Sequence, residues 1–148
     1  MQPAESLALR ALGQKEDGPA SELLVNDQST GVVLPGVTLE AQYRFGDRYL
    51  LFTTENVPYE EALHILLLDQ GFRRLDHIEL SHPFAEGTLS DVRARDAQVQ
   101  FSFFGGDFWE LSVAPRPRHL ARSECPVGVK GRLRRLLTPR FLVLRRIR

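Results

Sequence analysis

Apolar and polar residues alternate without a break from Val37 to Phe45. Because successive side chains of a strand point to opposite faces, this pattern predicts a strand with one buried face and one wet face. Gly46 and Asp47 follow, and a glycine in the first position favours a two-residue hairpin turn of type II′. The next segment, Arg48–Thr54, contains a continuous apolar run, which predicts a second strand covered on both faces.

The segment Pro58–Gln70 carries the signals of a helix. Asn56 is a suitable N-cap, and Pro58 suits the first helical turn. Glu60 and Glu61 would place negative charge at the positive end of the helix dipole. Apolar residues at helical spacing follow, and a glycine ends the pattern. We therefore expect one main helix packed against a face of the sheet.

Four later segments alternate or are bounded by turn residues in the manner of strands: Phe72–Leu80, Leu89–Arg95, Val99–Phe103 and Phe108–Val113. Leu89–Arg95 is polar for a strand, which indicates an edge position. The expected fold class is α+β, with a mostly antiparallel sheet of five or six strands. The expected order is β-β-α-β-β-β-β, followed by a basic C-terminal tail.

The chain divides into three parts that differ in composition and residue pattern. We expect residues 1–36 to be a weakly structured N-terminal segment, with a marginal helix at 3–12 and short strands around residues 23–25 and 32–34. Residues 37–114 form the predicted α+β core domain. Residues 115–148 form a basic segment rich in Arg, Pro and Leu, with a short helix at 131–137 and either a strand or a basic turn at 141–147.

Length and composition fit one compact domain, since the chain has 148 residues, of which 43% are hydrophobic and 26% charged. No run approaches the roughly 18 apolar residues of a membrane helix. The start lacks the basic n-region of a secretory signal, so we expect a cytoplasmic protein. Cys125 is the only cysteine, which excludes an internal disulfide and a metal cage built from thiolates of one chain.

The net charge of zero hides a strong segregation of charge along the chain. Residues 1–114 carry 8 basic and 18 acidic side chains, whereas residues 115–148 carry 11 basic and 1 acidic side chain. This asymmetry indicates an interaction segment, whose partner is nucleic acid, an anionic membrane, another protein or the acidic part of the same chain. The arginines best suited to phosphate are Arg132, Arg134, Arg135, Arg140, Arg145 and Arg146.

Two histidines, His77 and His82, lie near Asp76 and Glu79 and resemble an acid–base or metal cluster. On a strand, however, His77 and Glu79 share one face, while Asp76 and His82 share the other. Solvated strand residues are therefore favoured over a site. His64 falls inside the expected helix and is interpreted as a residue flanking its buried stripe.

The function favoured by these patterns is a non-enzymatic protein–protein interaction module of the adaptor, chaperone or inhibitor type. Its acidic part would bind a basic partner, with exposed aromatic side chains marking the surface. The candidate residues are Glu40, Glu60, Glu61, Phe104, Phe108 and Glu110.

Two alternative functions stay open. The first is binding of nucleic acid or anionic lipid through the arginine-rich tail. The second is a small hydrolase or metal enzyme that uses the region of His77 and His82. The sequence assigns no catalytic residue, no metal ligand and no cofactor.

Overall fold

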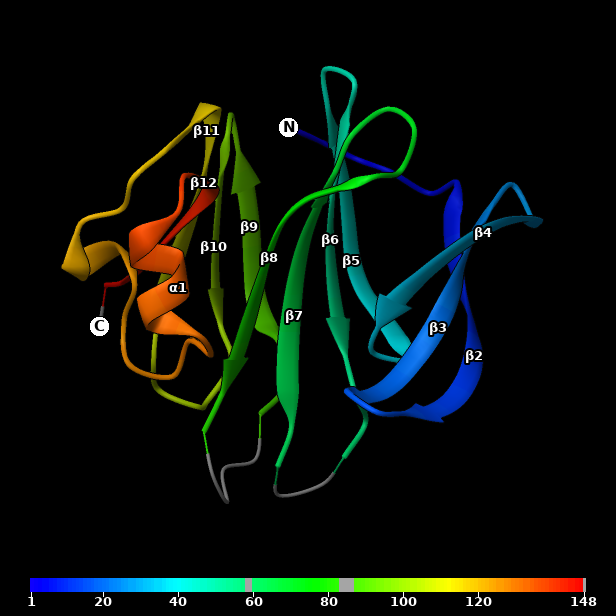
Figure 1. Cartoon of the computed structure of the whole chain (residues 1–148), viewed down its shortest axis with the longest axis horizontal. Coiled ribbons are helices and arrows are strands. Elements are labelled where there is room, and N and C mark those ends of the chain that lie inside the picture. Colours follow the sequence, from blue (N-terminus) through cyan, green and yellow to red (C-terminus); the bar gives the residue numbers. More distant parts are fainter. Residues whose placement is uncertain (58–59, 83–86, 148) are drawn as a thin grey trace.

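The computed structural model describes residues 1–57, 60–82 and 87–147, whose strands form three antiparallel sheets (Figure 1). The five-stranded sheet, in the order β1-β5-β6-β7-β8, contains β1 (Gln2–Pro3), β5 (Thr38–Phe45), β6 (Arg48–Thr54), β7 (Ala62–Leu68) and β8 (Arg74–Ser81). The four-stranded sheet, in the order β12-β11-β10-β9, contains β9 (Ser90–Arg95), β10 (Gln98–Ser102), β11 (Trp109–Arg118) and β12 (Arg140–Arg146). The three-stranded sheet contains β2 (Leu7–Lys15), β3 (Gly18–Val25) and β4 (Gln28–Pro35). The described residues also contain a 3-10 turn, η1 (Arg122–Glu124), and a short helix, α1 (Arg132–Leu137).

The α+β prediction is wrong, because the expected main helix is largely strand β7. Pro58 and Tyr59, where that helix was expected to begin, lie outside the described residues. Every residue of β7 is buried, and the strand pairs with β6 on one side and β8 on the other. A strand that is covered on both faces is apolar at every position, so apolar residues at helical spacing within it do not distinguish a helix from a strand.

The first hairpin is confirmed by the structure. β5 and β6 pair from Thr38↔Thr54 to Phe45↔Arg48, and Gly46 occupies the turn with a φ of 59°. This left-handed conformation explains the glycine at that position. The four later strands also appear as β8 to β11, and β9 lies at an edge of its sheet as expected.

Residues 1–36, expected to be weakly structured, contain the whole three-stranded sheet. The helix expected at 3–12 is wrong, since Leu7–Lys15 forms β2 and pairs with β3. The two short strands expected nearby are the longer β3 and β4. Asn26 and Asp27 join them with positive φ angles of 49° and 65°, which a two-residue type I′ turn requires.

The C-terminal segment is part of the sheets. β11 continues to Arg118, past the expected end of the core domain at residue 114, and β12 pairs with β11. Helix α1 matches the short helix expected there. Residues 128–130 bond to the outer side of β8, through Ser81 N–H to the Gly128 carbonyl, Lys130 N–H to the Glu79 carbonyl and the Leu80↔Val129 bridge.

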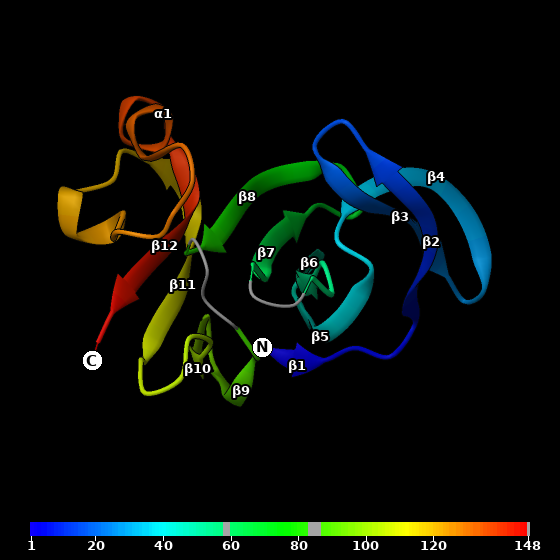
Figure 2. The same cartoon turned by 90° about the horizontal axis from the view of Figure 1, so that it is seen from below.

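Two apolar cores lie on opposite faces of the five-stranded sheet. The larger fills the space between this sheet and the four-stranded sheet, and includes Phe52, Ile65, Phe101, Trp109 and Leu142. The smaller joins the other face to the three-stranded sheet through residues such as Leu23, Leu34 and Leu66. Figure 2 shows β7 enclosed by this arrangement. Within the described residues, no helix is long and apolar enough to cross a membrane.

Candidate functional site

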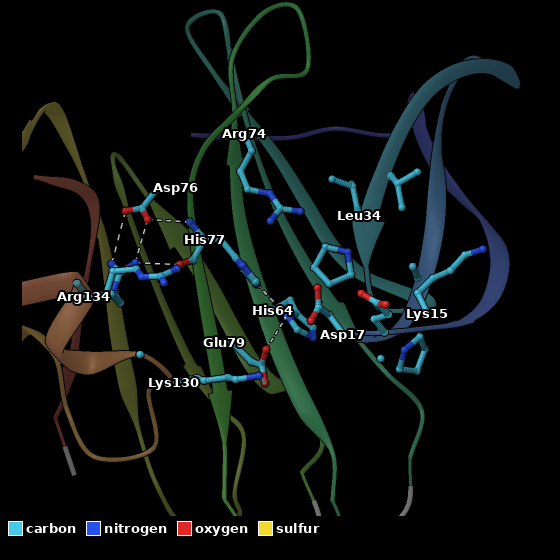
Figure 3. Close-up of a pocket in the computed structure, with 18 of the residues that line it drawn as sticks. Lys15, Asp17, Leu34, His64, Arg74, Asp76, His77, Glu79, Lys130 and Arg134 are labelled. Atoms are coloured by element: carbon cyan, nitrogen blue, oxygen red, sulfur yellow. Dashed lines mark hydrogen bonds and ion pairs between the residues drawn. The ribbon is translucent and has the colours of Figure 1, made fainter. Parts of the chain in front are cut away.

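A cavity of about 1150 Å³ opens where the end of the β2–β3 hairpin, strand β8 and the segment around α1 meet (Figure 3). Lys15 and Asp17 line it from the three-stranded sheet, and His64 and His77 line it from β7 and β8. Arg134 contributes from α1. The cavity thus collects polar side chains from parts of the chain that are distant in sequence.

The centre of the polar wall is a pair of histidines from adjacent strands. The register of β7 and β8 places His64 opposite Glu79 and Leu66 opposite His77, so both imidazoles emerge on the same face. Nδ1 of His64 lies 2.8 Å from Nε2 of His77, and the ring centroids are 5.1 Å apart. The two rings are therefore hydrogen-bonded to each other.

A carboxylate completes a chain of three groups. Nε2 of His64 lies 2.6 Å from Oε2 of Glu55, which follows β6. Because a carboxylate at neutral pH only accepts hydrogen bonds, His64 carries a proton on Nε2. A second carboxylate oxygen, Oε1 of Glu79, lies 3.9 Å from Nδ1 of His64. His64 is buried, so these groups hold its ring in one orientation.

His77 is held in the neutral form. Burial, together with the neighbouring His64 and Arg74, lowers the pKa of its imidazole to about 3. Nδ1 of His77 is the ring nitrogen that takes no part in the bond to His64. A neutral imidazole beside a cavity can accept a hydrogen bond or a proton from a ligand.

Asp76, the neighbour of His77 in sequence, faces the other way. Its carboxylate accepts hydrogen bonds from Arg135 at 2.9 Å, from Arg140 at 3.3 Å and from the backbone N–H groups of Phe141 and Leu142. The side chains of Asp76 and Arg135 are both buried. This carboxylate therefore joins β8 to the C-terminal segment and forms one wall of the cavity.

The remaining charges of the lining are mostly positive. The cationic side chains are Lys15, Arg74, Lys130, Arg134, Arg135 and Arg140, and the carboxylates are Glu16, Asp17, Asp76 and Glu79. Lys130 lies 3.8 Å from Glu79. Nε of Arg140 is buried with no hydrogen-bond partner among the described residues, which is unusual for a guanidinium nitrogen.

The acidic residues expected to bind a partner have mainly local contacts. Glu61 accepts hydrogen bonds from the N–H groups of Glu55, Asn56 and Ala62, and so fixes the entry to β7. Glu40 accepts from Thr54, and Glu110 accepts from Gln100. Glu60 is exposed.

The two aromatic candidates are half-buried. Phe104 packs edge-on against Phe103 and against His82, with ring centroids 4.7 Å and 6.2 Å apart. Phe108 lines a second, smaller hollow of about 350 Å³ with Ile147. The structure does not bring these aromatic residues and the acidic candidates together as one surface.

The arginines of the C-terminal segment divide by role. Arg135 and Arg140 bind Asp76, and Arg145 lies 2.8 Å from Glu124. The others are exposed: Arg132 donates to the Cys125 carbonyl, Arg134 lines the cavity, and Arg146 lies over the ring of Trp109. This basic segment thus docks on the acidic part of the chain, one of the alternatives that the charge pattern left open.

The expected group of His77, His82 and Asp76 does not form. Asp76 faces α1 and β12, His77 faces the cavity, and His82 packs against Phe104. The alternation of faces predicted for this strand is confirmed. Within residues 1–57, 60–82 and 87–147, no three His, Cys, Asp or Glu side chains are arranged to hold a metal ion.

Sequence reasoning missed Glu55, His64 and Arg74 as members of a site. His64 was assigned to a helix, which separated it from His77. With Ala62–Leu68 interpreted as a strand paired to the next one, the register would have placed both histidines on one face. The signal was therefore present in the sequence, in the spacing of two histidines around a tight connection.

Comparison of the chain with protein-family models, with curated proteins and with solved structures gave no match.

Proposed function

We propose that this protein binds a small anionic molecule, carrying a carboxylate or phosphate group, in the cavity beside His77. The observation that carries the proposal is His77, hydrogen-bonded to His64 in the wall of a cavity whose charged lining residues are six cations and four carboxylates. A large concave site with a few convergent polar groups and a displaced pKa is the best general indicator of a ligand site.

The balance of charge supports an anion. Asp76 is neutralised by two arginines, and Glu79 lies near Lys130. Arg74 and Arg134 have no carboxylate partner within the part of the chain that the structure describes. Guanidinium groups bind carboxylates and phosphates through paired hydrogen bonds, so these two side chains are suited to the ligand's charged group.

Calorimetric titration with sulfate and with succinate tests this function. We expect saturable binding of at least one of them, and Arg74→Gln and Arg134→Gln should each weaken it about 10- to 100-fold, as expected for the loss of a charge-assisted hydrogen bond. Arg95→Gln is the matched control, because Arg95 is exposed on β9 and outside the cavity. Equal affinities for all four proteins, or the absence of binding, would contradict the proposal.

A second candidate function is the interaction module expected from the sequence, with α1 as its contact. Leu133 and Leu137 are 70% and 67% exposed and lie one helical turn apart, and Leu133 is flanked by the exposed Arg132 and Arg134. Exposed leucines flanked by arginines suit a protein partner with an acidic, apolar surface.

Affinity purification with the full chain tests this second function. Leu133→Ser combined with Leu137→Ser should abolish retention of a partner, whereas Val33→Ser should not, because Val33 is exposed on β4, outside α1. A partner retained equally by all variants would show that α1 is not the contact.

Binding of nucleic acid or anionic lipid remains a prediction. Since Arg135 and Arg140 bind Asp76, the exposed Arg132 and Arg134 are its remaining candidates on α1. Binding of this kind requires an affinity that falls steeply as the salt concentration rises. The cytoplasmic location expected from the sequence also stays part of the proposal, and fractionation of cells that express a tagged chain would test it.

A further inference from the structure

We propose that Glu55, His64 and His77 form a proton relay, and that an anion binding in the cavity takes up a proton onto this relay. The inference rests on the proposed anion site and adds its coupling to pH. It assigns a role to the two histidines and the carboxylate as one unit, linked by contacts of 2.8 Å and 2.6 Å.

In the neutral state of the relay, each hydrogen bond has one proton. His64 donates from Nε2 to Glu55, and its Nδ1 accepts from Nε2–H of His77. This leaves a lone pair on Nδ1 of His77, the ring nitrogen outside the bond between the histidines. The neutral relay is thus ready to accept a proton at that nitrogen.

The charged state of the relay differs from the neutral state by one added proton and by the transfer of a second proton from His77 to His64. A proton binds Nδ1 of His77, and the proton on Nε2 of His77 moves across the 2.8 Å contact to Nδ1 of His64. His77 is again neutral, now with its proton on Nδ1, and His64 is an imidazolium. One proton has been gained, and no other bond has changed.

The positive charge belongs on His64 because of the carboxylates around that ring. Glu55 lies 2.6 Å from one of its nitrogens and Glu79 lies 3.9 Å from the other. His77, in contrast, is kept neutral by burial and by the nearby guanidinium of Arg74. In this relay, Nδ1 of His77 therefore contacts the ligand, whereas the ring of His64 holds the charge.

The other charged groups around the histidines set the sign of the coupling. From β8 these are Arg74, Asp76 and Glu79, and from the C-terminal segment they are Lys130, Arg134, Arg135 and Arg140. From the β2–β3 hairpin they are Lys15, Glu16 and Asp17. A positive charge on His64, already favoured by Glu55 and Glu79, is stabilised further by an anion bound beside the two histidines. Anion binding and proton uptake consequently favour each other.

Calorimetry with sulfate in buffers of different ionisation enthalpy measures the coupling. Sulfate keeps both charges above about pH 3, so any proton taken up binds to the protein. We expect uptake approaching about one proton per sulfate at a pH where the free relay is neutral and the bound relay is charged. Glu55→Gln and His77→Gln should retain sulfate binding with reduced affinity and lose the proton uptake.

Glu60→Gln is the matched control, because it makes the same change as Glu55→Gln at an exposed carboxylate that does not line the cavity. This variant should take up protons as the unaltered protein does. Nitrogen NMR of the histidines adds a measurement that needs no variant: with sulfate, His64 should change from the neutral to the imidazolium pattern, while His77 stays neutral.

The outcomes separate the two proposals. Sulfate binding without proton uptake would overturn the relay and leave the anion site standing. Uptake that persists in both Glu55→Gln and His77→Gln would also overturn it, because another group would then hold the proton. The absence of sulfate binding to the unaltered protein would overturn both.

Discussion

Asp76 shows how one buried charge is stabilised by groups from distant parts of the chain. Its carboxylate is fully buried and accepts hydrogen bonds from two arginines and three backbone N–H groups. Arg135 in turn donates to the carbonyls of His77 and Leu142. Burial of an ion pair is costly unless hydrogen bonds satisfy the polar atoms of both partners, and here nearly all of these atoms have a hydrogen bond.

Asp76→Asn should therefore lower the free energy of unfolding by about 3–5 kcal/mol, because it leaves the buried Arg135 without its counter-charge. Urea denaturation followed by tryptophan fluorescence measures this change. Asp96→Asn is a suitable control: Asp96 is exposed, and asparagine tolerates its positive φ of 54°. A loss of stability as small as that of the control would contradict the assignment of Asp76.

His77 makes a second prediction at this scale. Its folded pKa of about 3 lies below the unfolded value of 6.5, so the unfolded chain binds the extra proton first as the pH falls. The stabilisation is complete above pH 6.5 and decreases towards pH 3, by up to about 1.4 kcal/mol per pH unit. His77→Gln should flatten the dependence of melting temperature on pH between 6.5 and 4.5.

Below pH 4.5 both proteins should lose stability together. Hydrogen bonds from Arg118 lower the pKa of Glu124 to about 2, and hydrogen bonds from Ser29 and Arg10 lower that of Glu22 to about 2. The stabilisation that these two carboxylates provide is present above pH 4.5 and is lost as the pH approaches 2. An unchanged slope between pH 6.5 and 4.5 in His77→Gln would show that other groups control this range.

At the scale of elements, the sequence predicted the β5–β6 hairpin, because side-chain alternation and a glycine turn are local signals. It did not predict β7. Ala62–Leu68 is a strand because its neighbours β6 and β8 supply partners and both faces are covered, and neither condition is local. The misassigned strand also concealed the histidine pair, since the site depends on the register of two strands. Asn and Pro, which suggested the start of a helix, are also typical of turns and loops.

Glu61 distinguishes the two interpretations of this segment. As a residue in the first turn of a helix, it would contribute a few tenths of a kcal/mol. As the acceptor of three backbone hydrogen bonds at the entry to β7, its loss in Glu61→Ala should cost about 1–3 kcal/mol. Glu60→Ala is the adjacent control and should be nearly neutral, since Glu60 is exposed. Equal effects in thermal unfolding would contradict the role given to Glu61.

At the scale of the whole molecule, the C-terminal segment completes both the core and the cavity. Leu142 and Leu144 of β12 are fully buried in the larger core, and residues 128–130 cover the outer side of β8. The charge asymmetry of the sequence left docking of this segment on the acidic part of the chain open as one of several alternatives. It did not indicate that two of its arginines serve a single buried aspartate.

A fragment ending at residue 114 should therefore not fold cooperatively. It would lack the partner of β11 and would leave Asp76 buried without its donors. We expect weak dispersion of its amide NMR signals and no sharp thermal transition, whereas the full chain should give well-dispersed signals and a sharp transition. A fragment with a cooperative transition would demonstrate an independent core domain.

The junction between β8 and β12 also has a consequence for biosynthesis. Asp76 and Leu142 are 66 residues apart, so the contact between β8 and β12 forms only after β12 has left the ribosome. Until then, the apolar inner faces of β8 and β11 lack their final partners, which makes the nascent chain prone to aggregation. Synthesis of this protein should consequently benefit from a chaperone that covers apolar strands, and slower translation upstream of β12 should lower the soluble yield.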